Sequence, residues 1–443
     1  MKPLPRRFRP VFFLLLVGAV PSLNAADAPF VRRFDFGSGA VAEGWTAVRA
    51  DSVYSKETGF GFEPGYAVEA VDRGGDALRG DFVTSSRPFL FSVAVPEGTY
   101  RVTVTMGDRR GTSSATIKAE SRQLMVENAN TSEGAFVERP FVVNVRNASL
   151  PPPPPNAPGG SEVRLNDRER GLFRWDDKLT IEFNGAAPKV CAVQLERVEV
   201  PTIFLAGDST VTDQPYEPTA SWGQMLPRFF KPVVAVANHA ESGETLKSFL
   251  TELRLDKILS QVRRGDYLFI QFGHNDSKVQ WPQTYVEAAT TYRSYLRAYI
   301  AEARRRGVTP VLVTSMHRRT FDANGRIKNS LGDYPDAVRA VAREENVALI
   351  DLQAMSAAFY EALGPDKAPK AFSAGGKDAT HHDNYGAYEL ARCVVQGIRD
   401  ARLPLVDFLS EDAGEFDPAK PDNVDTFALP SSPERSDLRP RGN

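Results

Sequence analysis

The chain has 443 residues, more than one ordinary hydrophobic core accommodates, and this length indicates two domains. Its 54 lysine and arginine residues nearly balance 56 aspartate and glutamate residues, so the formal net charge is −2. A chain without a basic excess cannot neutralise many phosphates, and we therefore expect no nucleic-acid partner.

The first 26 residues have the pattern of a secretory signal peptide. Lys2 and three arginines precede an apolar run at residues 11–20, and small residues follow at Ala25 and Ala26. A run of ten residues is too short to cross about 30 Å of hydrocarbon as a helix. We predict an exported protein, periplasmic or secreted, with no membrane span in the mature chain. A short membrane anchor is the alternative.

Residues 29–200 have the pattern of short strands. Residues 100–106, 179–183 and 191–195 alternate apolar and polar side chains, which is typical of half-buried strands. Clusters of Gly, Pro, Asn and Asp separate these runs. We predict an antiparallel β-sandwich and interpret the proline run at 151–155 as a loop within it, because strand patterns resume afterwards.

Residues 201–405 alternate strands with helices. Short apolar runs at 203–206, 233–236, 267–270, 308–313 and 347–350 are separated by helical stretches, among them 283–305, 336–345 and 385–401. This order predicts an α/β domain of three layers with a parallel sheet. The polar tail, residues 406–443, is expected either to wrap the surface or to be poorly ordered.

Four loops at strand ends or helix starts carry the chemistry. Ser209 follows the first apolar run, Gly243 the second and Asn275 the third, while Asp378 and His381 precede the last helix. Active sites of such sheets form at the carboxyl ends of the strands. A glycine lets a backbone N–H approach a ligand closely, and Asn275 offers an amide donor.

These residues supply the parts of an acyl-transfer site. We predict that Ser209 attacks, that His381 accepts its proton, and that Asp378 orients His381 from one turn away. The N–H groups of Ser209 and Gly243 and the amide of Asn275 would hold the oxyanion. This chemistry needs no metal and no cofactor, and the spacing of the histidines matches no metal-binding pattern.

The four blocks, in this order, resemble the GDSL/SGNH hydrolase family, whose Ser, Gly, Asn and His hallmarks correspond to Ser209, Gly243, Asn275 and His381. The phrases at 207–211, 273–276 and 378–381 are similar to bacterial rhamnogalacturonan acetylesterases. Residues 34–38 and 44–46 resemble the galactose-binding-like sandwich that precedes such hydrolases. Fungal relatives carry Arg-Ser after the second-block glycine, whereas this chain has Glu244-Thr245, so that cation is not carried over.

The resemblance implies an esterase that removes acetyl groups from a plant cell-wall polysaccharide, with pectic rhamnogalacturonan as the leading candidate. Two alternatives stay open: an esterase for acetylxylan, a lipid or a thioester, and a carbohydrate-binding protein with an inert hydrolase domain. Whether the front domain binds glycans or acts as a scaffold is also open. The sequence does not give the oligomeric state.

Several further residues are candidates for substrate contacts. They are His274, Trp281 and His382, with His382 expected in the cleft or on the surface. Trp222 is a sugar platform or a core residue, and Arg318 and Arg319 bind a substrate carboxylate or form a solvated pair. Cys191 and Cys393 are expected to be buried thiols, with a single disulfide as the alternative.

Overall fold

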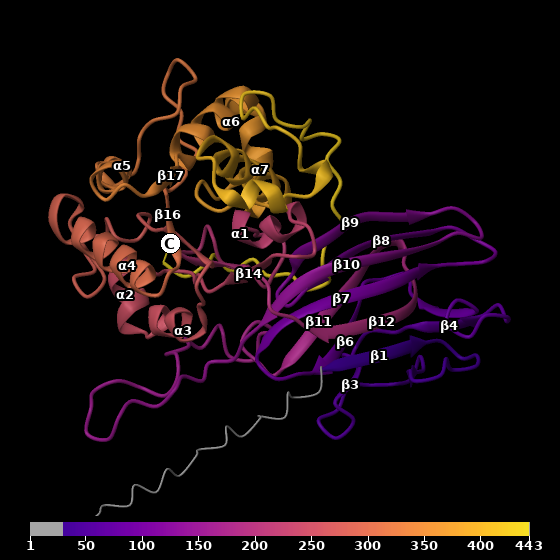
Figure 1. Cartoon of the computed structure of the whole chain (residues 1–443). Coiled ribbons are helices and arrows are strands. Elements are labelled where there is room, and N and C mark those ends of the chain that lie inside the picture. The colour runs from indigo at the N-terminus through magenta and orange to yellow at the C-terminus, as the bar shows by residue number, and fades with distance from the viewer. Residues whose placement is uncertain (1–29, 443) are drawn as a thin grey trace, which may run out of the picture.

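The computed structural model describes residues 30–442 and shows two differently built parts, a β-sandwich and an α/β domain (Figure 1). This architecture confirms the predicted fold class. The predicted signal peptide lies outside the described residues.

The sandwich consists of two sheets that enclose one core. One sheet has the order β10-β7-β12-β1-β2, with β5 pairing with β12 and β4, and the other has the order β3-β6-β11-β8-β9. Among the described strands of these sheets, β1 and β2 pair in parallel and the other pairs are antiparallel. The strands are β1 (Val31–Phe36), β2 (Thr46–Val48), β3 (Phe60–Phe62), β4 (Glu69–Asp72), β5 (Asp81–Thr84), β6 (Phe89–Ala94), β7 (Gly98–Gly107), β8 (Ser113–Ala119), β9 (Gln123–Thr131), β10 (Phe136–Val145), β11 (Lys178–Ala187) and β12 (Lys189–Arg197).

The period-two pattern of β7 explains its place in the sandwich. Its apolar residues Tyr100, Val102, Val104 and Met106 are fully buried in the core that both sheets share. The segment between β10 and β11 contains the proline run and leads back into the sandwich, as predicted. On its way it contacts the α/β domain, where the Arg164 N–H donates to the carbonyl oxygen of Glu252 at 3.0 Å.

The α/β domain is a parallel sheet covered on both faces. Its strand order is β14-β13-β15-β16-β17. Residues of β13 are buried throughout, because one apolar cluster covers each face of the sheet. Helices α2 to α5 contribute to one cluster, and α1, α6 and α7 contribute to the other (Figure 1). The elements are β13 (Thr202–Gly207), α1 (Trp222–Met225), β14 (Ala235–Asn238), α2 (Leu246–Thr251), α3 (Arg254–Gln261), β15 (Tyr267–Gln271), α4 (Arg293–Arg305), β16 (Thr309–Val313), α5 (Tyr334–Glu344), β17 (Ala348–Ile350), α6 (Leu352–Lys367) and α7 (Asn384–Asp400).

The helix predicted from residue 283 begins later than expected. α4 starts at Arg293, after one π-helical turn at Ala288–Tyr292. Glu287 has an extended backbone, and its N–H donates to the hydroxyl of Thr291 at 2.8 Å. This side-chain hydrogen bond competes with helical pairing and leaves residues 283–287 as a loop.

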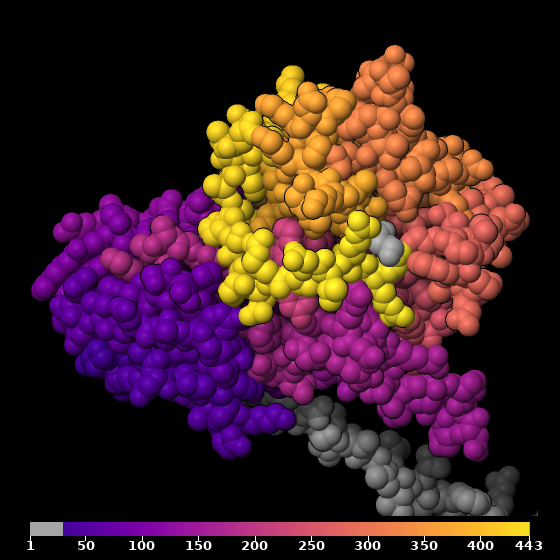
Figure 2. Space-filling model, turned by 180° about the vertical axis from the view of Figure 1, so that it is seen from behind, coloured from indigo at the N-terminus to yellow at the C-terminus, as the bar shows by residue number. Residues whose placement is uncertain are grey.

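The tail wraps the surface, one of the two outcomes that the sequence left open. It runs over the α/β domain and then along the seam with the sandwich (Figure 2, yellow). Cys191 and Cys393 are buried free thiols, so the alternative of a disulfide is wrong. Within residues 30–442, no helix has both the length and the apolar character needed to cross a membrane.

Candidate active site

The predicted loops meet at the carboxyl edge of the parallel sheet. The loop of Ser209 follows β13, that of Gly243 follows β14, and that of Asn275 follows β15, while Asp378 and His381 lie just before α7. Parallel strands end at one edge of their sheet, which is why residues far apart along the chain come together here.

Ser209, His381 and Asp378 form one hydrogen-bonded line. The Ser209 Oγ lies 2.8 Å from His381 Nε2, and His381 Nδ1 lies 2.9 Å from Asp378 Oδ2. An imidazole held in this way can accept the hydroxyl proton through Nε2 while Nδ1–H stays bonded to the carboxylate.

Asp378 is held as an acceptor by its own turn. Its Oδ1 accepts hydrogen bonds from the N–H groups of Thr380 (2.7 Å) and His381 (3.0 Å). Burial by itself would raise the pKa of Asp378, but the hydrogen bond and charge of His381 and these two N–H groups lower the pKa below its ordinary value. The carboxylate is therefore ionised at neutral pH and can stabilise a charged imidazole.

The oxyanion side of the site contains Gly243 and Asn275. Gly243 has a φ of +89°, a left-handed conformation that favours glycine. The Asn275 amide donates to the carbonyl oxygen of Glu244 at 3.1 Å, and its Oδ1 accepts from the Lys278 ammonium at 2.9 Å. These contacts fix the amide beside the loop that carries Gly243.

A buried chain of hydrogen bonds that the sequence did not reveal holds the nucleophile loop. The Thr210 hydroxyl donates to Asp208 Oδ1 (2.7 Å) and accepts from Gln271 Nε2 (2.8 Å). Gln271 Oε1 in turn accepts from the indole N–H of Trp222 at 2.8 Å. Trp222 is therefore a core residue and not a sugar platform. The one feature of the sequence that indicated this chain of hydrogen bonds is the polar Gln271 at the end of the otherwise apolar strand β15.

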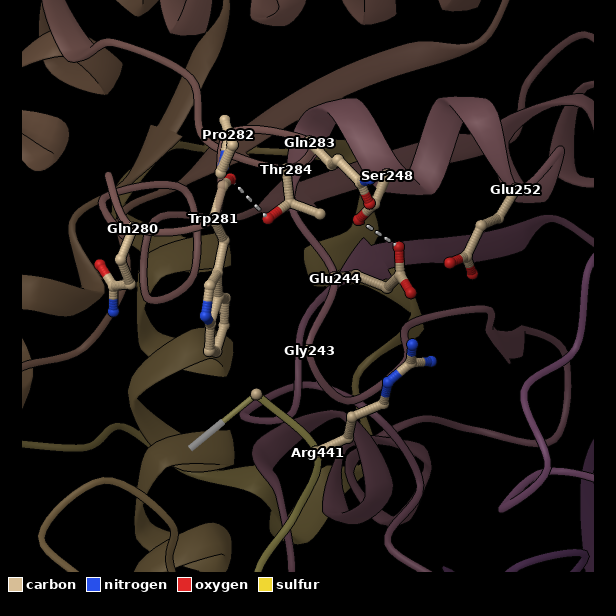
Figure 3. Close-up of a pocket in the computed structure, with 11 residues that line it drawn as sticks. Gly243, Glu244, Ser248, Glu252, Gln280, Trp281, Pro282, Gln283, Thr284 and Arg441 are labelled. Atoms are coloured by element: carbon tan, nitrogen blue, oxygen red, sulfur yellow. Dashed lines mark hydrogen bonds between the residues drawn. The ribbon is translucent and has the colours of Figure 1, made fainter.

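Trp281 lies on the wall of a cavity beside Gly243. The cavity measures about 530 Å³ and is also lined by Glu244 and Arg441. In Figure 3 the indole of Trp281 stands on one side, and Arg441 and Glu244 lie on the opposite side. Trp281 is 39% exposed, and the Lys278 ammonium lies 4.5 Å from the centroid of its ring.

The two histidines proposed for substrate contacts, His274 and His382, are buried. Burial and the positive charge of Arg318 lower the pKa of His274, so this ring is neutral. His382 is 1% exposed, and its Nε2 lies 2.7 Å from the Tyr360 hydroxyl. It also packs against the ring of Phe372. His382 is thus not on the surface, and its contacts are those of a core residue.

Arg318 and Arg319 do not form a solvated pair. The Arg318 guanidinium donates to the carbonyl oxygens of His274 (3.1 Å) and Ser330 (3.3 Å), and Arg319 binds the carbonyl oxygen of Gly376. Both arginines therefore stabilise loops near the site through hydrogen bonds to backbone carbonyl groups. In the part of the chain that the structure describes, no three His, Cys, Asp or Glu side chains are grouped as metal ligands.

Comparison with known proteins gives two family matches. Residues 205–386 match the GDSL-like lipase/acylhydrolase family, and residues 32–137 match the beta-agarase/YXIM esterase-like, galactose-binding domain-like family. The chain is similar to the rhamnogalacturonan acetylesterase RhgT of Bacillus subtilis (strain 168), with 43% identity over 226 residues, 48% of this chain and 96% of that protein.

The uncharacterized esterase YxiM of the same organism is 29% identical over 402 residues, 88% of this chain and 96% of that protein. Its crystal structure has a TM-score of 0.46 at 27% identity and covers 85% of this chain and 99% of its own. The family match of residues 205–386 and the similarity to RhgT define a carboxylic ester hydrolase. The chain belongs to the GDSL-like lipase/acylhydrolase family, and the predicted family resemblance is confirmed.

Proposed function

We propose that this chain is an exported esterase that removes acetyl groups from a plant cell-wall polysaccharide, with pectic rhamnogalacturonan as the leading substrate. The observation that carries the proposal is the line from Ser209 Oγ through the His381 ring to the Asp378 carboxylate, with separations of 2.8 and 2.9 Å. This geometry suits transfer of the hydroxyl proton as the serine attacks an ester carbonyl.

The reaction would proceed in two steps. Ser209 Oγ bonds to the acetyl carbon while His381 Nε2 takes the serine proton, and the resulting oxyanion accepts hydrogen bonds from the N–H groups of Ser209 and Gly243 and from the Asn275 amide. His381 then protonates the sugar oxygen as its bond to carbon breaks. A water molecule, deprotonated by His381, then attacks the acetyl-serine. His381 returns the proton to Ser209 Oγ as the bond between Oγ and the acetyl carbon breaks, and acetate is released.

Two arguments support the substrate and the location. RhgT is named a rhamnogalacturonan acetylesterase, and a second Bacillus subtilis relative, YesY, with 41% identity over 95% of its length, is named a probable rhamnogalacturonan acetylesterase. The N-terminal pattern of Lys2, an apolar run at 11–20 and Ala25-Ala26 supports export, and a cell-wall polymer is an extracellular substrate.

Acetate release from acetylated rhamnogalacturonan, acetylated xylan and a short-chain lipid ester tests the proposal. We expect the wild type to be most active on rhamnogalacturonan and Ser209→Ala to lose at least about 10³-fold in kcat, since the nucleophile is removed. Ser294→Ala, a change on the exposed face of α4, is the matched control and should keep full activity.

Each alternative has its own result in this assay. A preference for xylan or lipid would reassign the substrate and keep the esterase mechanism. Full activity in Ser209→Ala would overturn the mechanism, and no hydrolysis of any ester by the wild type would favour a carbohydrate-binding protein.

A further inference from the structure

A side chain from the sandwich part reaches two loops of the active site. Arg174 lies on the segment between β10 and β11, and its side chain is 3% exposed. The guanidinium donates to the Thr212 hydroxyl (2.6 Å) and to the carbonyl oxygen of Asp213 (2.8 Å). It also forms an ion pair with the carboxylate of Glu241. One arginine thus connects a loop after β13 to a loop after β14.

These two loops carry the proposed nucleophile and an oxyanion donor. Thr212 follows Ser209 closely in the chain, and its N–H donates to the Asp208 carbonyl oxygen at 3.1 Å. Glu241 closely precedes Gly243, and its N–H donates to the carbonyl oxygen of Gly207 at 3.1 Å. A shift of either loop would change the distance between the serine and the Gly243 N–H. Oxyanion donors are effective only when this geometry is fixed in advance.

The Glu241 carboxylate depends on a cation. Burial raises the pKa of Glu241 above its ordinary value, and the charge of Arg174 opposes this rise. The charge of the neighbouring Arg254 also lowers the pKa of Glu241, but the Arg254 guanidinium donates its hydrogen bonds to Glu169, at 2.9 and 2.6 Å. Without Arg174, the Glu241 carboxylate would bind a proton more readily, and the ion pair that connects the Glu241 loop to the Thr212 loop would be lost.

We propose that Arg174 is a positioning residue for ester hydrolysis. It fixes the position of the Ser209 loop relative to the Gly243 loop. The sandwich part then completes the catalytic unit and is more than an appended binding module. This inference rests on the proposed function, because it takes Ser209 as the nucleophile.

The test compares Arg174→Met with Arg170→Met, the same change on the same segment at a side chain that is 67% exposed. Hydrolysis of p-nitrophenyl acetate is measured per serine labelled to completion with a fluorophosphonate, so unfolded protein is not counted. We expect Arg174→Met to lower kcat per labelled site about 30-fold or more, with KM nearly unchanged, because a misplaced oxyanion donor costs about 10²–10³-fold in other enzymes. Arg170→Met should match the wild type.

Arg174→Lys covers the case in which the Met variant does not fold. A lysine keeps a charge near Glu241 but lacks the planar fork that binds all three acceptors, so we expect about a tenfold loss of kcat. An unchanged kcat per labelled site in Arg174→Lys would overturn the positioning role. Absence of Ser209-dependent hydrolysis in the wild type would instead overturn the proposed function.

A second and independent observation concerns residues 434–442, which belong to the tail that runs along the seam between the two parts (Figure 2, yellow). The Glu217 N–H donates to the carbonyl oxygen of Glu434 (2.9 Å), and the Ser436 N–H donates to that of Glu217 (3.0 Å). Farther along, the Lys278 ammonium binds the carbonyl oxygen of Gly442. The segment is therefore attached at both ends.

Gly442 lies against the oxyanion side of the site. A methyl group added to Gly442 would be 2.7 Å from the Gly243 Cα and 2.9 Å from Asn275 Oδ1. Ser209 is 4% exposed and His381 is 1% exposed. An ester carbonyl cannot enter between Gly243 and Asn275 while Gly442 occupies that position.

We infer that residues 434–442 form a cover that must leave the oxyanion site before the substrate binds. This inference too rests on the proposed function. Activity is then reduced by the fraction of molecules in which the cover is closed.

Gly442→Ala is the sharpest test, because the added methyl group clashes with Gly243 and because φ is +93° at this position. We expect kcat/KM for p-nitrophenyl acetate to rise about 3–10-fold. Gly414→Ala is the matched control, since Gly414 also lies in the tail with positive φ (+49°) and has no atom within 4 Å of an added methyl group. That control should keep the wild-type rate.

Deletion of residues 434–443 should raise kcat/KM at least as much as Gly442→Ala does. Wild-type or lower rates in both the deletion and Gly442→Ala would overturn the cover and make the segment a fixed wall of the site. Failure of a fluorophosphonate to label Ser209 in the deletion variant would count against the proposed function.

Discussion

The Asp378 carboxylate offers a prediction whose size follows from the geometry. Asp378→Asn keeps the shape of the side chain but removes the negative charge that lies 2.9 Å from His381 Nδ1. With about 4 Å between the charge centres and an effective dielectric constant of about 20, the lost attraction to a charged imidazole is about 4 kcal/mol. Each 1.4 kcal/mol or so is tenfold in rate, so kcat should fall about 10³-fold.

The assay is hydrolysis of p-nitrophenyl acetate at neutral pH. Asp383→Asn is the matched control: Asp383 caps α7 through a hydrogen bond from the Gly386 N–H at 3.0 Å, and asparagine caps helices about as well as aspartate. The control should keep kcat within about threefold. If kcat of Asp378→Asn falls less than tenfold, the electrostatic reasoning is refuted and the role of Asp378 is structural.

Three further predictions concern the surroundings of the site. Burial raises the pKa of Asp276 to about 7, so the folded state binds this proton more tightly than the unfolded state does. The wild type therefore loses stability as pH rises from about 4 to about 7, whereas Asp276→Asn, which does not titrate, escapes this loss. The melting temperature of Asp276→Asn minus that of the wild type should be a few degrees larger at pH 8 than at pH 5. Trp281→Ala should raise KM for an acetylated polysaccharide about 3–10-fold and leave KM for p-nitrophenyl acetate unchanged, because the ring borders the cavity beside Gly243. Tyr360→Phe leaves the buried His382 ring without its hydrogen bond and should lower the free energy of unfolding by about 1–3 kcal/mol in urea titrations, with kcat unchanged.

The elements that sequence predicts well are those with a local signal. The strands of the parallel sheet are apolar because both faces are buried, and the residues of β13 carry this pattern in four consecutive apolar side chains, Ile203 to Ala206. Ser209 and Asn275 could be assigned because they closely follow such strands. The three-residue spacing of Asp378 and His381 likewise sufficed to predict their pairing.

Contacts between distant segments leave no such signal. Arg174 and Glu241 are 67 positions apart and belong to differently built parts of the chain, so no periodicity connects them. The path of residues 434–442 depends on individual hydrogen bonds, such as that between Ser436 and Glu217. The burial of His382 depends on Tyr360, which is brought to it by the packing of α6 against α7.

These distant contacts change how glycan binding by the sandwich can be tested. Deletion of residues 29–200 would remove a candidate binding surface, but it would also remove Arg174 and the side chain of Gln123, which donates to Asp213 Oδ2 at 2.7 Å. A lower activity of the deletion variant would follow from either loss. Substitutions that keep the domain separate the two roles. A residue that binds glycan should change KM for the polysaccharide alone, whereas a residue that holds the loops should change kcat for polysaccharide and small ester alike.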